Sequence, residues 1–124
     1  MDRRQRIGRR GEAEAARFLR RRGFVIVDQN VRSRLGEIDL VARDGDTLVF
    51  VEVKARRGGR GDPPQAGVTP RKQARLGRLA LSYLKARRLS EVRCRFDVVG
   101  ITVDEEDRVA AIRHLPGAFE LTGW

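Results

Sequence analysis

A glutamate and a lysine interrupt an otherwise apolar segment near the middle of the chain. Residues 47–55 have the sequence Thr-Leu-Val-Phe-Val-Glu-Val-Lys-Ala, which is typical of a β-strand buried on both faces, apart from Glu52 and Lys54. Because alternate residues of a strand share a face, both charged side chains should lie on the same side of the sheet. Charged groups in a buried strand are costly unless they are paired or bind a metal, so this pair indicates a functional site.

Asp39 is a second carboxylate that strand register can bring to the same face. Residues 44–46 have the sequence Asp-Gly-Asp, which is typical of a tight hairpin turn. If Asp44 pairs with Thr47, Asp39 lies directly opposite Glu52; if the turn is one residue earlier, Asp39 lies diagonal to Glu52. Both registers place the two carboxylates on one face, whereas an intermediate register without a bulge would separate them.

Two carboxylates beside a lysine are suited to metal-assisted hydrolysis of a phosphodiester. Acidic oxygens suit Mg²⁺ or Mn²⁺, and such an ion polarises the phosphoryl group and lowers the pKa of a bound water. Lys54 can orient that water or neutralise charge in the transition state. Only three of the 27 basic residues are lysines, so a lysine here suggests that a compact, titratable ammonium is required.

The elements that must position these residues follow from hydrophobic periodicity and from turn residues. Helical spacing predicts one helix over residues 9–22, ended by Gly23, and a second helix that begins after the capping residue Thr69. Within the strand predicted over residues 37–42, Ile38, Leu40 and Ala42 are expected on one face of the sheet. The apolar runs predict strands over residues 24–27, 37–42, 47–55, 95–103 and 109–114. The order αβββαββ predicts an α/β fold, a mixed β-sheet flanked by helices.

The length of the chain suits one domain over residues 1–124. Within it, residues 1–7 are expected to form a flexible basic arm. Residues 56–68 are rich in glycine, proline and arginine, and are expected to form a mobile loop that resembles a lid.

The charge of the chain favours a polyanionic partner. The formal net charge is +10, the pI is near 11.3, and residues 71–88 contain seven bases and no acid. Nucleic acid is the expected partner, with DNA favoured over RNA, although a basic ribosomal protein would show similar charge. The expected phosphate contacts are Arg32, Arg34, Arg56, Arg57, Arg71, Lys72 and Arg75.

Several classes of protein are excluded by composition. No segment is apolar over the length needed to span a bilayer and no export signal is present, so a cytoplasmic location without a membrane partner is expected. The single cysteine, Cys94, excludes an internal disulfide and a thiolate metal cluster, and is expected in the core. The single histidine, His114, excludes a multi-histidine metal centre and is expected to be structural.

Three motifs in a fixed order resemble one family. They are Gly8 with Gly11-Glu12, then Gly36-Glu37-Ile38-Asp39-Leu40, then Phe50-Val51-Glu52-Val53-Lys54. Together they resemble the YraN-like bacterial proteins, a branch of the PD-(D/E)xK nuclease superfamily, and the resemblance extends from Gly8 to about Val99. It implies a restriction-endonuclease-like core. It also implies that Asp39 and Glu52 are metal ligands and that Lys54 is the catalytic lysine, although Ile38 stands where the superfamily motif has proline.

Three further residues have open alternatives. The resemblance points to Glu12 as a third metal ligand, but this carboxylate can equally stabilise the helix N-terminus. Glu37 can be an outer ligand or a solvent-facing acid. Gln65 and Lys72 are candidates to contact the scissile strand once the loop closes, and the resemblance supports Lys72.

The leading hypothesis is a Mg²⁺- or Mn²⁺-dependent endonuclease that hydrolyses DNA phosphodiesters, with junctions or flaps as candidate structured substrates. Its selectivity would come from nucleic-acid shape, a homodimer or a protein partner, because phosphate contacts alone cannot distinguish sequences. The alternative is a non-catalytic nucleic-acid-binding or scaffold protein that retains the nuclease fold. A ribosome-associated structural protein is a third hypothesis, for which Glu52 would be dispensable.

Overall fold

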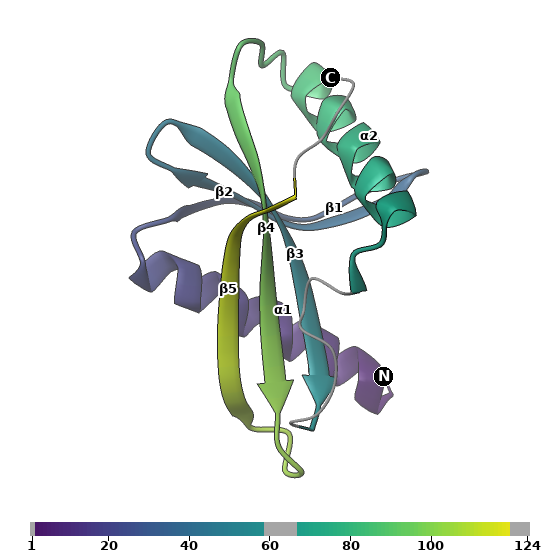
Figure 1. Ribbon diagram of the computed structural model, residues 1–124, viewed down its shortest axis with the longest axis vertical. Helices are drawn as coiled ribbons and strands as arrows, with labels where there is room; N and C mark the ends of the chain where they lie inside the picture. Colours follow the sequence, from purple (N-terminus) through teal and green to yellow (C-terminus); the bar gives the residue numbers. More distant parts are fainter. Residues whose placement is uncertain (1, 59–66, 120–124) are drawn as a thin grey trace.

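The computed structural model describes residues 2–58 and 67–119, which form two helices and five strands (Figure 1). In chain order these are α1 (Arg3–Arg21), β1 (Val25–Ser33), β2 (Gly36–Asp44), β3 (Thr47–Arg57), α2 (Pro70–Ala86), β4 (Arg93–Val103) and β5 (Val109–Phe119). The order αβββαββ and the α/β class predicted from the sequence are confirmed.

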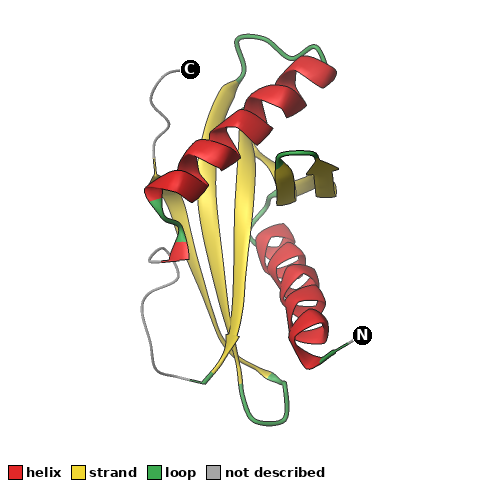
Figure 2. Ribbon diagram, turned by 90° about the vertical axis from the view of Figure 1, so that its right-hand side faces the viewer, coloured by secondary structure: helices red, strands yellow, loops and turns green. Residues whose placement is uncertain are grey.

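The five strands form one mixed sheet in the order β1-β2-β3-β4-β5. The central pair, β3 and β4, is parallel, and the other neighbouring pairs are antiparallel. A parallel pair needs a crossover, and α2 lies within the segment that connects β3 to β4. The two helices lie on opposite faces of the sheet, so each face has a separate apolar core (Figure 2).

Alternation along β3 supplies both cores. Val49 and Val51 pack on the side of α1, whereas Leu48 and Phe50 pack on the side of α2. Both faces of this strand are therefore buried, which explains why residues 47–51 show no polar alternation. Glu52 and Lys54 follow where the burial decreases.

One glycine allows α1 to approach the sheet closely. A Cβ added at Gly11 would lie 2.7 Å from Cβ of Ala55 in β3, which is closer than two such carbons can come. Gly11 itself is buried, and Glu12 follows it directly. The close approach brings the Glu12 side chain near the strands that carry the other acids.

The helix α1 begins six residues before the predicted start. Asp2 caps it by accepting a hydrogen bond from the main-chain N–H of Gln5 at 2.8 Å, and the Gln5 side chain accepts one from the N–H of Asp2 at 3.0 Å. Residues 3–7, expected in a basic arm, are therefore the first turns of α1. Ile7 is the one residue of these turns that packs against the core beside α1, so the apolar stripe is sparse there.

The expected loop over residues 56–68 also differs where the structure describes it. Arg56 and Arg57 continue β3, and Val68 is buried in the core on the side of α2. The rest of that segment, including Gln65, lies outside the described residues. The edge strands β1 and β5 are longer than predicted, because main-chain pairing continues past the short runs that predicted them; Val31, Leu115 and Phe119 in the added parts pack against the core beside α2.

Candidate active site

The hairpin of β2 and β3 has the first of the two predicted turns. Asp44 pairs with Thr47, and the ladder continues to the pair Leu40 and Val51. The predicted register is therefore confirmed. Before Leu40 in β2, the main chains of the two strands no longer pair. There the side chain of Asp39 is the hydrogen-bond partner of β3: its Oδ2 accepts a hydrogen bond from the N–H of Val53 at 2.7 Å.

The regular alternation of β2 breaks at Asp39. Leu40 and Ala42 belong to the core beside α1, but Ile38 belongs to the core beside α2. The prediction that these three residues share a face is therefore wrong for Ile38. The change of side at Asp39 coincides with the end of its strand pairing, so the carboxylate lies where β2 separates from β3.

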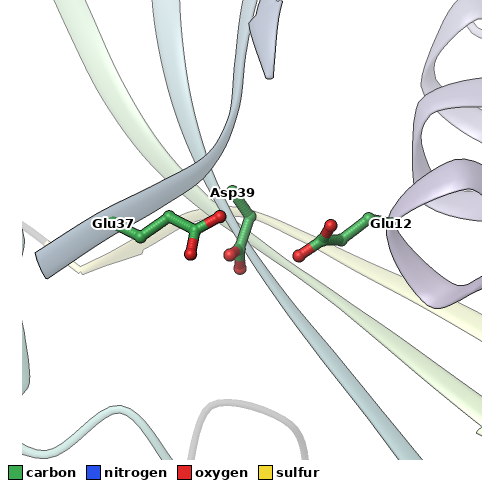
Figure 3. A group of neighbouring side chains, drawn as sticks. All are labelled: Glu12, Glu37 and Asp39. Carbon is green, nitrogen blue, oxygen red and sulfur yellow. The ribbon is translucent and has the colours of Figure 1, made fainter. Parts of the chain in front are cut away.

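Three carboxylates from two elements gather at this point. One oxygen from each of Glu12, Glu37 and Asp39 lies within 4.8 Å of the others. Figure 3 shows the Asp39 side chain between Glu37, from β2, and Glu12, from α1. All three side chains are half-buried. Glu37 is thus part of the cluster, which the sequence left open between an outer ligand and a solvent-facing acid.

Asn30 holds two of these acids together. Its Nδ2 donates to Oε1 of Glu37 at 2.7 Å and to Oε1 of Glu12 at 3.0 Å. The residue has a positive φ of 50°, a left-handed conformation that asparagine tolerates better than most residues. Asn30 was not predicted as a site residue, since in the sequence it is an ordinary polar residue after a short apolar run.

The acidic cluster strongly perturbs Asp39. Burial raises the pKa of this carboxyl from 3.8 to about 8, and the nearby charges of Glu52, Glu12 and Glu37 add to the effect, against the hydrogen bond from Val53. Asp39 is therefore protonated at neutral pH when no cation is near. Hard carboxylate oxygens on three side chains are the donor set that a divalent cation such as Mg²⁺ or Mn²⁺ prefers, so the residues fit this group.

Glu52 lies in a second, basic part of the site. Its Oε1 is 3.0 Å from Nζ of Lys72 and 3.7 Å from Nζ of Lys54. Lys72 comes from the first turn of α2, so the contact joins that helix to β3. Glu52 is not among the three acids that approach one another within 4.8 Å, although its charge reaches Asp39.

The two lysines differ in proton affinity. Burial and the hydrogen bond and charge of Lys72 lower the pKa of Lys54. Burial alone would also lower the pKa of Lys72, but its hydrogen bonds with Lys54 and Glu52 outweigh this and raise it. Lys54 is thus the lysine that gives up its proton more readily. The rarity of lysine among the basic residues had suggested a titratable ammonium at position 54, and the lowered pKa is of that kind.

The remaining predicted phosphate contacts surround this site unevenly. Arg71 and Arg75 are exposed on α2, and Arg34 is exposed in the turn between β1 and β2. Nε of Arg32 lies 3.7 Å from Oε2 of Glu37. Near the far end of β3, Arg56 is half-buried and Arg57 donates to the main-chain oxygen of Glu105 at 3.3 Å.

A cleft of about 730 Å³ opens beside the acids, between α1 and β1. Glu12, Asn30 and Glu37 line one part of it, and Arg9 and Arg32 supply positive charge. Arg9 was not predicted as a site residue. Its helical spacing from Glu12 could have shown that the two side chains lie on neighbouring parts of one helix face.

The single histidine belongs to a separate buried network. Its Nε2 lies 2.8 Å from Oδ2 of Asp97, whose side chain is completely buried. Arg95 donates to both oxygens of the same carboxylate, at 2.9 and 3.1 Å, and the N–H of Gly117 donates at 3.0 Å. These contacts connect β4 with β5 and support the structural role expected for His114.

The buried ion pair of Asp97 was not predicted, although the spacing of Arg95 and Asp97 places both side chains on one face of a strand. Cys94, expected in the core, is half-buried, and burial raises the pKa of its thiol. Neither helix, over the part of the chain that the structure describes, is long and apolar enough to cross a membrane.

Comparison with known proteins gives a consistent result over most of the chain. The model of the family described as "Uncharacterised protein family UPF0102" matches residues 11–101. The chain is 46% identical over 115 residues to a UPF0102 protein of Geotalea uraniireducens, covering 93% of this chain and 90% of the relative. It is 47% identical over 118 residues to one of Pelotomaculum thermopropionicum, covering 95% and 98%. The chain therefore belongs to the UPF0102 family, in keeping with the YraN-like resemblance of its motifs.

Proposed function

We propose that this protein is a divalent-metal-dependent nuclease of the PD-(D/E)xK superfamily that hydrolyses phosphodiester bonds in DNA. The observation that carries the proposal is the position of Asp39. Its carboxyl stands between Glu12 and Glu37, has a pKa raised to about 8 without a cation, and acts through its charge on Lys54, a lysine of lowered pKa. Three carboxylates brought within 4.8 Å of one another, with a pKa raised as far as that of Asp39, are costly for a protein that only folds.

Glu12, Glu37 and Asp39 would hold Mg²⁺ or Mn²⁺. When bound, the ion supplies charge stabilisation at the phosphoryl group and acidifies a bound water. Glu52 approaches the same region from β3 and would join the ligands only by giving up its contact with Lys72. The ligand set supported by geometry therefore has Glu37 in place of Glu52 in the set implied by the motifs.

Lys54 would act as the proton acceptor or as the group that orients the attacking water. Its lowered pKa gives Lys54 a larger neutral fraction than an ordinary lysine has at the same pH. Lys72 keeps its proton and would bind a phosphate oxygen or hold Glu52. Lys54 would thereby serve in proton transfer, and Lys72 would neutralise negative charge.

A non-catalytic nucleic-acid-binding or scaffold protein is the second candidate function. The contacts of Glu52 favour it, because Lys54 and Lys72 already neutralise this carboxylate without any metal. Under this alternative the lysines and Glu52 join α2 to β3 as a structural ion-pair cluster.

Cleavage assays on defined substrates test the proposal. Purified protein is incubated with duplex, single-stranded and four-way-junction DNA and with duplex RNA, each with Mg²⁺, with Mn²⁺ or with a chelator. Asp39→Asn and Lys54→Ala are compared with Asp46→Asn, which removes an exposed carboxylate in the hairpin turn. We expect metal-dependent cleavage by the wild type and Asp46→Asn only. Cleavage that survives in both site variants, or cleavage on no substrate, would overturn the proposal.

A further inference from the structure

Four basic side chains form a straight line along the outer face of α2. Arg71, Arg75, Arg78 and Lys85 are separated by four, three and seven residues, the spacing that keeps residues on one face of a helix. All four are exposed. With a rise of 1.5 Å per residue, the line extends about 21 Å from Arg71 to Lys85. We call these residues the α2 basic stripe.

The charge of the α2 basic stripe has no acidic partner in the part of the chain that the structure describes. Other arginines have acidic partners: Arg3 pairs with Asp107 at 2.9 Å and Arg17 with Glu14 at 2.8 Å. In the described ranges 2–58 and 67–119, no acid forms an ion pair with a residue of the stripe. A row of like charges repels itself, so it is stabilised only when a polyanion binds.

The opposite face of α2 excludes a membrane surface as the partner. Its apolar residues Leu76, Leu79, Ala80 and Tyr83 are buried against the sheet. A helix that lies in a lipid interface needs its apolar face for the acyl chains. Beside the stripe, α2 exposes one large apolar side chain, Leu81, which alone is too small an apolar face for a lipid interface, so the stripe suits a phosphate backbone.

The stripe begins at the candidate active site. Lys72, next to Arg71, places its Nζ 3.0 Å from Oε1 of Glu52. The Arg75 side chain passes over Gly36, since Cδ and Nε would lie 3.6 Å from a Cβ added there. Gly36 directly precedes Glu37 of the acidic cluster, so a strand bound to the stripe would pass close to the carboxylates.

A corresponding line on α1 lacks these properties. Positions 10, 14, 17 and 21 have the same spacing as the start of the stripe, but Glu14 interrupts them and pairs with Arg17. The segment from Pro70 to Arg88, in contrast, contains no acidic residue. The two helices lie on opposite faces of the sheet, so one straight duplex cannot lie along both (Figure 2).

We propose that the α2 basic stripe binds the phosphate backbone of a DNA duplex and directs one strand toward the acidic cluster. The direction toward the cluster rests on the proposed function, whereas the binding does not. One strand presents a phosphate about every 3.4 Å along the duplex axis, so a rigid line of about 21 Å spans about six nucleotides. Contacts of this kind recognise the shape of the backbone and carry no base specificity.

Two variants with the same loss of charge test this surface. One is Arg71→Gln/Arg75→Gln/Arg78→Gln/Lys85→Gln, and the other is Arg10→Gln/Arg17→Gln/Arg20→Gln/Arg21→Gln on α1. Each removes four positive charges from exposed helix positions, and in both sets the last turn loses basic residues. Thermal unfolding first establishes that both variants are folded.

Fluorescence anisotropy then measures the Kd for a short labelled DNA duplex in chelator, so that the outcome does not depend on metal or cleavage. We expect the stripe variant to lose at least about tenfold in affinity and its slope of log K against log salt to fall by about 3 to 4, with little change for the α1 variant. Equal losses in both variants, an unchanged stripe variant, or tighter binding of duplex RNA would overturn the proposal. So would loss of binding to phosphatidylserine vesicles with DNA binding retained.

The outcome is separable from that of the proposed function. A protein that cuts nothing but shows the stripe-dependent binding supports the stripe and refutes the nuclease. A protein that cuts DNA equally well with and without the stripe refutes the stripe and supports the nuclease.

Discussion

The main-chain N–H of Val53 donates to Oδ2 of Asp39 at 2.7 Å, just beyond the last main-chain pair of the hairpin. A side chain thus replaces the main chain of β2 as the partner of β3. The bond fixes the carboxylate where the two strands separate, and Glu12 and Glu37 approach it there. Asp39 is consequently both part of the hairpin and the centre of the acidic cluster.

Stability of the metal-free protein should fall with rising pH. The pKa of Asp39 is about 8 in the folded protein against 3.8 ordinarily, so the folded state holds this proton more tightly than the unfolded state. Its stabilising effect is complete below about pH 4 and is lost as the pH rises through about 8. Urea unfolding in chelator should show a decrease on the order of a few kcal/mol across this range. Asp39→Asn should flatten that part of the profile, and an equally steep profile in this variant would contradict the assignment.

Divalent cations should bind and displace the proton from Asp39. At pH 7, calorimetry with Mn²⁺ in buffers of different ionisation enthalpy should show release of about one proton per ion. Saturating Mn²⁺ at about 100 times its Kd should raise the unfolding free energy by about 2.7 kcal/mol. Glu12→Gln should weaken both effects while Asp46→Asn leaves them unchanged. Proton release that persists in Asp39→Asn would exclude Asp39 as its source.

Lys72 should control the pH profile of cleavage through Lys54. The hydrogen bond and the charge of Lys72 both lower the pKa of Lys54, so Lys72→Ala should raise that pKa. If neutral Lys54 accepts a proton, the rising limb of kcat against pH should move to higher pH in Lys72→Ala. Lys54→Ala should lose about 10² to 10⁴ in rate. A loss of rate in Lys72→Ala without any movement of the limb would mean that Lys72 acts on substrate binding alone.

Gly11 should be required for the approach of α1 to the sheet. Gly11→Ala places a methyl group 2.7 Å from Cβ of Ala55, and should cost about 1 to 3 kcal/mol of unfolding free energy while weakening Mn²⁺ binding through the displaced Glu12. Gly8→Ala is the matched control, because no atom lies within 4 Å of its added Cβ. That substitution should stabilise α1 by up to about 1 kcal/mol. The unfolding free energies of both variants, measured by chemical denaturation, distinguish steric crowding at position 11 from a general effect of replacing glycine with alanine in α1.

The buried Asp97 should matter for stability and not for metal binding. Asp97→Ala leaves His114 and Arg95 without their shared acceptor and should cost about 3 to 5 kcal/mol. His114→Ala should cost less, since Arg95 and Gly117 still satisfy the carboxylate. Folded material of either variant should bind Mn²⁺ with the wild-type Kd. A specific loss of metal affinity in His114→Ala would connect this network with the active site.

Most of the fold could be predicted from local sequence patterns. Turn residues and alternation left two registers for β2 and β3, because a short hairpin allows few ways to pair two strands, and the structure has the first of them. The same patterns placed Glu52 and Lys54 on one strand, two residues apart. Errors arose where main-chain hydrogen bonds or caps extend an element past the periodic run that predicted it, as at the start of α1 and along β1 and β5.

The sequence by itself therefore determined the order of the elements, two candidate registers of the hairpin, and Asp39, Glu52 and Lys54 as candidate site residues. Only the tertiary structure decided that Glu12, Asn30 and Glu37 meet at Asp39, and that Lys72 neutralises Glu52. The reason is physical: register within a hairpin depends on neighbouring residues, whereas the approach of α1 and α2 depends on how two opposite cores pack. Such packing depends on contacts like that of Gly11 with Ala55, which no spacing in the sequence reveals.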